Sequence, residues 1–241
     1  MKPKPRSAPK ATASRRPNRL RSFKPWLVAW LIIYAIIIGA GIFTQYGPLP
    51  SIIRVGGIFL CFVYAALIYP HDRLLILTLF LTCLADLVLI FNNASILGLV
   101  IFFLAQFTHL FRLSPVYYRR VVVLYGLVAL SLSFLALTLQ LLSPLYVVCF
   151  FYGLTLAFNL FTAWRWRHHQ PRNLHANLAA IGFTLFASCD LCTATSYLAL
   201  SGVLPSFLYA PTRFFVWFFY YPSQILISNS PKYATIDPKE G

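Results

Sequence analysis

Apolar residues form long runs along this chain, and short polar turns separate one run from the next. A helix needs about 20 apolar residues to cross the hydrocarbon core of a bilayer. Eight runs of suitable length can be recognised, at residues 26–43, 52–69, 74–91, 96–111, 121–139, 145–164, 178–200 and 207–227. We therefore predict an all-α fold, a polytopic membrane bundle of eight transmembrane helices.

The two ends of the chain differ from this pattern. Residues 1–25 hold nine Lys/Arg and five prolines without apolar periodicity, which is typical of a disordered segment. We predict three parts: a disordered basic tail at 1–25, a transmembrane domain at 26–228 and a C-terminal tail at 229–241.

Positive charge falls in every second loop. Arginines occur at Arg73, between Arg112 and Arg120, and between Arg165 and Arg172, whereas the intervening loops contain neither Lys nor Arg. Basic loops of membrane proteins remain on the cytoplasmic side. We therefore predict that both termini are cytoplasmic.

The overall charge adds information about partners. The chain is 59% hydrophobic and carries a formal net charge of +15. Its basic residues lie in the N-terminal tail and in short loops, where they fix the orientation and can contact anionic lipid headgroups. We expect membrane lipids as partners and no nucleic acid, while the sequence leaves the oligomeric state open.

Two carboxylates stand out against the apolar background. The chain has five acidic residues, and Asp86 and Asp190 lie inside apolar runs. An ionisable group is expensive there, so it usually faces the protein interior and marks a functional site. The alternative is that each carboxylate only neutralises a buried arginine. Two of them in similar local contexts favour the functional interpretation.

The same positions indicate a weak internal repeat. Ala85-Asp86 in the third run corresponds to Cys189-Asp190 in the seventh. Gln106 in the fourth run corresponds to Gln224 in the eighth. This spacing is compatible with two parallel four-helix repeats, related by an axis along the membrane normal.

Other polar residues recur at helical spacing. One continuous stripe of the eighth run consists of Arg213, Trp217, Tyr220 and Gln224. Tyr152 and Asn159 share a face of the sixth run. Gln106 and His109 share a face of the fourth. Interhelical hydrogen bonds explain any single pair, but together the stripes predict a polar cavity within the bundle.

Depth along the helices suggests how the charges are balanced. Arg54 and Arg213 lie near the outer ends of the second and eighth runs. We expect these two cations to neutralise Asp86 and Asp190 in the outer half of the membrane.

Several other chemistries fit poorly. Cys189 and Cys192 form a CxxC pair, but no second pair or His cluster accompanies them, so we predict no metal site. The sequence also lacks the motifs of serine hydrolases, zinc peptidases and phosphate-binding loops. We expect no cofactor, and a pair of intramembrane carboxylates with Tyr, Gln and Arg helpers remains.

Short motifs around these residues match a known membrane family. They are Leu84-Ala85-Asp86, Phe102-Phe103-Leu104-Ala105-Gln106 with His109, Phe186-Ala187-Ser188-Cys189-Asp190 and Tyr220-Tyr221-Pro222-Ser223-Gln224. Over about residues 26–228 the chain resembles the YhhN-like family, which includes the lysoplasmalogenases. It departs from the family pattern at Gln106, where many members have His, and at Cys189, where Ser is usual.

The resemblance implies a membrane hydrolase that cleaves the vinyl ether bond of lysoplasmalogens, giving an aldehyde and a glycerophospho-base. Asp86 and Asp190 would be the catalytic pair, and Arg54 or Arg213 would hold the phosphate of a lysophospholipid-like substrate. The full set of expected substrate-binding residues is Arg54, Gln106, His109, Tyr152, Asn159, Arg213, Tyr220 and Gln224.

Two other classes of function stay open at this point. The carboxylate pair would also serve as the proton relay of a transporter for small solutes or lipids. A third interpretation is a lipid-binding membrane protein without catalysis.

Overall fold

The computed structural model describes residues 19–43, 48–91, 95–139 and 143–232, and this part of the chain consists of helices and short turns, without strands. The long helices are α1 (Arg19–Phe43), α2 (Pro48–Ile68), α3 (Arg73–Phe91), α4 (Ile96–Leu113), α5 (Arg119–Thr138), α6 (Pro144–His169), α7 (Leu174–Leu200) and α8 (Tyr209–Ser228). Short 3₁₀ turns at Val116–Tyr118 and Ser206–Leu208 precede α5 and α8. The prediction of an all-α bundle is therefore confirmed.

Five of these helices, α3 to α7, are long and apolar enough to cross a membrane. Shorter apolar stretches, Pro25–Gly39 and Ile52–Ile68, lie within α1 and α2. The helices of the bundle expose many Leu, Ile, Val and Phe side chains, as expected where the surrounding solvent is hydrocarbon. The chain is a multi-pass membrane protein.

Both ends of the bundle depart from the predicted boundaries. Helix α1 already begins at Arg19, so residues 19–25 are helical rather than disordered. The stretch before Pro25 contains Arg, Leu and Lys, which are good helix formers. Residues 1–18 lie outside the described part. At the other end, residues 229–232, the first part of the predicted C-terminal tail, pack onto the bundle.

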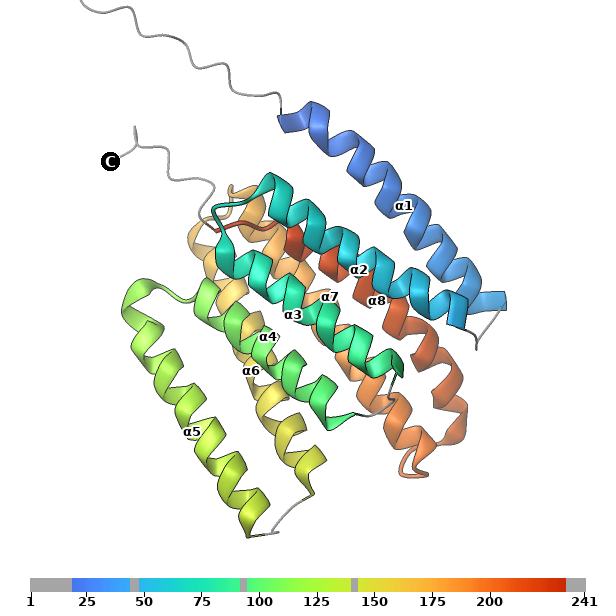
Figure 1. Cartoon of the computed structure of the whole chain (residues 1–241), viewed down its shortest axis with the longest axis vertical. Helices are drawn as coiled ribbons and strands as arrows, with labels where there is room; N and C mark the ends of the chain where they lie inside the picture. The colour runs from blue at the N-terminus through green and yellow to red at the C-terminus, as the bar shows by residue number, and fades with distance from the viewer. Residues whose placement is uncertain (1–18, 44–47, 92–94, 140–142, 233–241) are drawn as a thin grey trace, which may run out of the picture.

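The helices run alternately in opposite directions, and α1 starts at the end of the bundle where α8 stops (Figure 1). The packed pairs are α1·α2, α2·α3, α3·α4, α1·α8, α2·α8, α4·α5, α4·α6, α5·α6, α6·α7 and α7·α8. When α1–α4 are exchanged in order with α5–α8, each packed pair corresponds to another packed pair. For example, α2·α8 corresponds to α4·α6, and α1·α8 corresponds to α4·α5. Accordingly, α1 and α5 lie on opposite flanks of the bundle (Figure 1).

Two features position helix α8: close packing against a glycine of α7, and a hydrogen bond to a carbonyl that Pro222 leaves without its usual partner. A Cβ atom on Gly182 of α7 would lie 2.9 Å from Cγ1 of Ile227, so a side chain there would separate α7 from α8. Pro222 has no N–H to bond the carbonyl of Phe218 one turn earlier. The hydroxyl of Tyr34 in α1 donates to that carbonyl instead, at 3.2 Å. These contacts fix the rotation of α8 about its axis, and with it the direction of its polar stripe.

Candidate functional site

Two carboxyl groups meet tyrosine hydroxyls in the interior of the bundle. Tyr220 of α8 donates a hydrogen bond of 2.6 Å to Oδ2 of Asp86 in α3. Tyr152 of α6 donates a short hydrogen bond to Oδ2 of Asp190 in α7. We call these four residues the carboxyl–tyrosine site. Its members come from four helices, so the site exists only once the bundle has assembled.

The two carboxyl groups of this site lie in one region of the bundle interior. Asp86 and Asp190 are close enough for the charge of one to act on the other. Asp86 is only 8% exposed, whereas Asp190 is half-buried. Two carboxyl groups that share a poorly solvated region do not readily ionise together. The arrangement therefore suits one protonated and one ionised carboxyl group.

Aromatic rings enclose the carboxyl–tyrosine site. The rings of Phe186 and Trp217 lie 5.7 and 5.5 Å from that of Tyr220, between centroids. The ring of Phe102 packs edge-on against Tyr152 at 6.3 Å. Apolar walls lower the local dielectric and strengthen the effect of each charge on a bound molecule.

The arginines do not neutralise these carboxylates in the expected way. The guanidinium of Arg54 lies 4.4 Å from the ring centroid of Trp217, and Asp86 is bound by Tyr220 rather than by Arg54. Arg213 donates to the hydroxyl of Tyr209 at 2.5 Å. Depth along a helix had suggested ion pairs, but the rotation of α2 and α8 directs these side chains elsewhere.

Instead, the two arginines share a cavity of about 50 Å³. It lies among α1, α2 and α8, and it is lined by Ile37, Ile38, Arg54, Tyr209, Ala210, Arg213, Phe214 and Trp217. We call it the arginine cavity. Trp217 connects it to the carboxyl–tyrosine site, because the same ring contacts both Arg54 and Tyr220.

The remaining predicted site residues are buried, and two of them bond each other. Nδ2 of Asn159 donates to both the main-chain and side-chain carbonyls of Gln106, each at 2.8 Å. His109 packs edge-on against Phe183 at 5.1 Å, and Gln224 is 1% exposed. Asn159 and Gln106 thus connect α6 to α4, an interhelical role that needs no substrate. The structure places their hydrogen bonds outside the carboxyl–tyrosine site.

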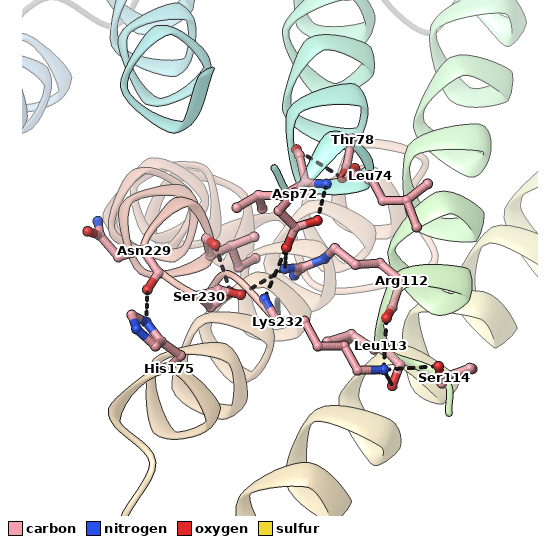
Figure 2. A network of polar contacts seen from close by, with 12 residues as sticks. Asp72, Leu74, Thr78, Arg112, Leu113, Ser114, His175, Asn229, Ser230 and Lys232 are labelled. Carbon is pink, nitrogen blue, oxygen red and sulfur yellow. Dashed lines mark hydrogen bonds and ion pairs between the residues drawn. The ribbon is translucent and has the colours of Figure 1, made fainter. Parts of the chain in front are cut away.

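A second polar network, which the sequence pattern does not indicate, lies at the end of the bundle where the chain leaves α8 (Figure 2). Arg112, which is fully buried, donates to the carbonyl of Ser230 at 2.8 Å and lies 3.6 Å from Oδ2 of Asp72. Asp72 also accepts from the main-chain N–H of Leu75 and of Lys232, at 3.1 and 3.0 Å. We call Asp72, Arg112, Ser230 and Lys232 the C-terminal clamp.

Lys232 completes the C-terminal clamp. Its Nζ donates to the carbonyls of Arg112, Leu113 and Ser114 at 2.9–3.0 Å, which satisfies acceptors left over at the C-terminal end of α4. Burial, followed by the positive charges of Arg112 and Arg119, lowers the pKa of Lys232 to about 8, although Asp72 opposes the shift. Next to it, Nδ1 of His175 donates to the carbonyl of Asn229 at 2.9 Å (Figure 2).

Comparisons with known proteins agree with the predicted family. No curated protein and no solved structure matches the chain significantly. The sequence profile of the YhhN family matches residues 49–231, well over half of the chain. The matched region begins at α2 and extends through α8 into the C-terminal clamp, and it includes every residue of the carboxyl–tyrosine site. The chain therefore belongs to the YhhN family.

Proposed function

We propose that this protein is an integral membrane hydrolase that cleaves the vinyl ether bond of lysoplasmalogen-like lipids at the carboxyl–tyrosine site. The main support is one observation: Asp86 and Asp190 each accept a hydrogen bond from a tyrosine hydroxyl inside the bundle. The family resemblance supplies the substrate class. The paired carboxyl groups supply an acid and a stabilising charge, which is what the reaction needs.

The reaction begins with transfer of a proton to carbon. Asp190 is the more exposed of the two carboxyl groups and is the one that can reach a substrate. Its Oδ2 is occupied by Tyr152, so we place the acidic proton on Oδ1. Protonation of the vinyl carbon remote from the ether oxygen leaves an oxocarbenium ion. Asp86, held by Tyr220, stabilises this cation in the ionised form.

Water completes the cycle. A water molecule adds to the oxocarbenium carbon and gives its proton back to Asp190, which restores the acid. The resulting hemiacetal breaks into an aldehyde and the free hydroxyl of a glycerophospho-base. One water is consumed and no oxidant or reductant takes part, so the balance needs only the two carboxyl groups.

The membrane arrangement that we propose comprises eight spans with both termini in the cytoplasm. The alternation of arginine-containing loops supports it. The matched packing of α1–α4 and α5–α8 supports two parallel four-helix repeats, which are also found in transporters. A proton-coupled transporter is therefore the second candidate function, with the same carboxyl groups acting as a relay.

Turnover without a gradient separates the two candidates. Purified protein in detergent micelles is incubated with a lysoplasmalogen, and the released aldehyde is measured. A hydrolase produces aldehyde under these conditions, whereas a transporter or a lipid-binding protein produces none. The Asp86→Asn variant is the matched control for contaminating hydrolases. Absence of product from protein that is folded and monodisperse would overturn the proposal.

A further inference from the structure

We infer that Arg54 and Arg213 together form one binding site for the phosphate group of a single-chain phospholipid. This inference rests on the proposed function, since it names the part of the substrate that the arginine cavity holds. The sequence pattern had suggested that the two arginines neutralise the two carboxylates. In this inference both arginines bind one anion instead.

The charge balance of the arginine cavity calls for an anion. Arg54 and Arg213 interact as like charges, and the described residues that line the cavity include no carboxylate. The whole sequence has five acidic residues: Asp72 lies in the C-terminal clamp, Asp86 and Asp190 accept tyrosine hydroxyls, and the other two follow residue 232. Arg54 is half-buried and Arg213 is exposed. Bringing a second guanidinium group next to a partly buried one costs free energy, and a bound anion offsets that cost.

The geometry of Arg54 is suited to a phosphate. Its guanidinium stacks on Trp217, so the planar face is occupied by the ring while the N–H groups along its edge can point into the cavity. Arg54 is half-buried, and within the described part of the chain its buried Nε has no hydrogen-bond partner. Guanidinium edges bind phosphate oxygens through paired N–H donors. A cavity of about 50 Å³ admits a phosphate group, whereas an acyl chain would have to extend out of it.

The distance to the carboxyl–tyrosine site identifies the rest of the ligand. Arg213, Trp217 and Tyr220 are spaced i, i+4 and i+7 along one face of α8, so Arg213 and Tyr220 are about 10 Å apart along the axis at a rise of about 1.5 Å per residue. A glycerol backbone and the reach of the side chains bridge such a distance. The ligand therefore has its phosphate between the arginines, its glycerol along Trp217 and the first bond of its single chain near Asp190.

The test measures binding of lipids that the protein cannot cleave. Full-length protein in detergent micelles is titrated with a saturated 1-alkyl-glycerol 3-phosphate, with the corresponding 1-alkylglycerol and with inorganic phosphate. We expect the lipid phosphate to bind about tenfold or more tightly than the alkylglycerol, as charge-assisted hydrogen bonds imply. Inorganic phosphate at equal concentration should not compete with it. Equal binding of the two lipids, or equal competition by free phosphate, overturns the inference.

Variants assign the effect to the two arginines. Arg54→Gln and Arg213→Gln should each reduce the affinity for the lipid phosphate to that of the alkylglycerol and leave alkylglycerol binding unchanged. Arg54→Lys should retain part of the preference because the charge remains. Arg120→Gln, at an exposed position outside the cavity, is the matched control and should behave like the wild type. If Arg54→Gln binds both lipids less well, Arg54 is structural and the inference fails.

This experiment is independent of catalysis. A protein without hydrolase activity can still bind a saturated ether lipid through its phosphate. Conversely, rapid hydrolysis of a vinyl ether of glycerol that lacks phosphate would support the proposed reaction while overturning the phosphate site. The two proposals can therefore fail separately.

Discussion

Tyr220 donates a hydrogen bond of 2.6 Å to Asp86, although the two residues are 134 positions apart in the sequence. The bond joins α8 to α3, two helices that are not among the closely packed pairs of the bundle. It therefore spans the interior that α2, α4, α6 and α7 enclose. A reaction centre at this bond depends on both halves of the chain.

The first prediction concerns the carboxyl groups. Asp86→Asn and Asp190→Asn should each abolish release of aldehyde, and the double variant should be no worse, because the two groups act as one unit. Asparagine keeps the shape of the side chain, so the proteins should still fold. Asp72→Asn makes the same chemical change in the C-terminal clamp and should retain turnover per folded molecule. Near-normal turnover in either site variant would show that its carboxyl group is only structural.

The tyrosines provide the second prediction. Tyr220→Phe removes one hydroxyl and leaves the ring contacts with Phe186 and Trp217 in place. A hydrogen bond to a charged group contributes about 1.5–3 kcal/mol, so kcat/KM should fall about 10- to 100-fold. Tyr125→Phe is the control, because that hydroxyl bonds Thr155 at 2.9 Å, on α6. Equal effects of the two variants would argue against a role of Tyr220 in the reaction.

Much of this architecture could be predicted from sequence because it depends on local properties. Apolar runs define helices whatever their neighbours are, and the position of Asp86 within such a run is informative by itself. The partners of Asp86 depend on the rotation and order of helices, which no local pattern contains. For that reason the sequence pattern placed Tyr220 on a polar face of its helix but did not reveal its bond to Asp86. The expected neutralisation of the carboxylates by Arg54 was wrong, because Arg54 stacks on Trp217.

The C-terminal clamp could not be predicted for a related reason. Its hydrogen bonds join residues 118 and 160 positions apart, and each member alone has the appearance of a loop or tail residue. Asp72 precedes Arg73 in a short turn, and Lys232 follows a proline in what composition describes as a tail. Only the structure shows that the buried guanidinium of Arg112 lies between Asp72 and the carbonyl of Ser230, while Lys232 donates to the carbonyl of Arg112.

A third prediction follows from the pKa of Lys232. The pKa is about 8 in the folded protein, below its ordinary value of 10.5, so between these pH values the unfolded state binds more protons than the folded state. Stability linked to this group therefore rises with pH over that range. The melting temperature of the wild type, relative to that of Lys232→Met, should increase from pH 8 to pH 10. A constant difference would contradict the lowered pKa.

The fourth prediction concerns topology. In a cysteine-free background, single cysteines at Ser143 and Ser201 should react with an impermeant thiol reagent in intact cells. Cysteines at Arg120 and His169 should react only after the cells are opened, because arginine-containing loops remain in the cytoplasm. All four positions are exposed. Ser201 is preferred to Gly202, whose φ of 78° would strain a cysteine. Labelling of Arg120→Cys in intact cells would contradict this prediction and indicate the opposite orientation.

The last prediction tests the chemical step. Protonation on carbon must place one solvent-derived hydrogen on the carbon next to the new aldehyde. A hydrolase that attacked an ester would leave that position unchanged, and a transporter would give no product. Purified protein is therefore incubated with a lysoplasmalogen in deuterated water, and the aldehyde is trapped at once and weighed by mass spectrometry.

One deuterium per aldehyde on that carbon is the expected result. Exchange of the free aldehyde with solvent would also introduce deuterium, so unlabelled aldehyde added to the Asp190→Asn variant under the same conditions serves as the control. That sample should stay unlabelled over the time of trapping. An unlabelled product from the active protein would exclude proton transfer to carbon, and with it the role that we assign to Asp190.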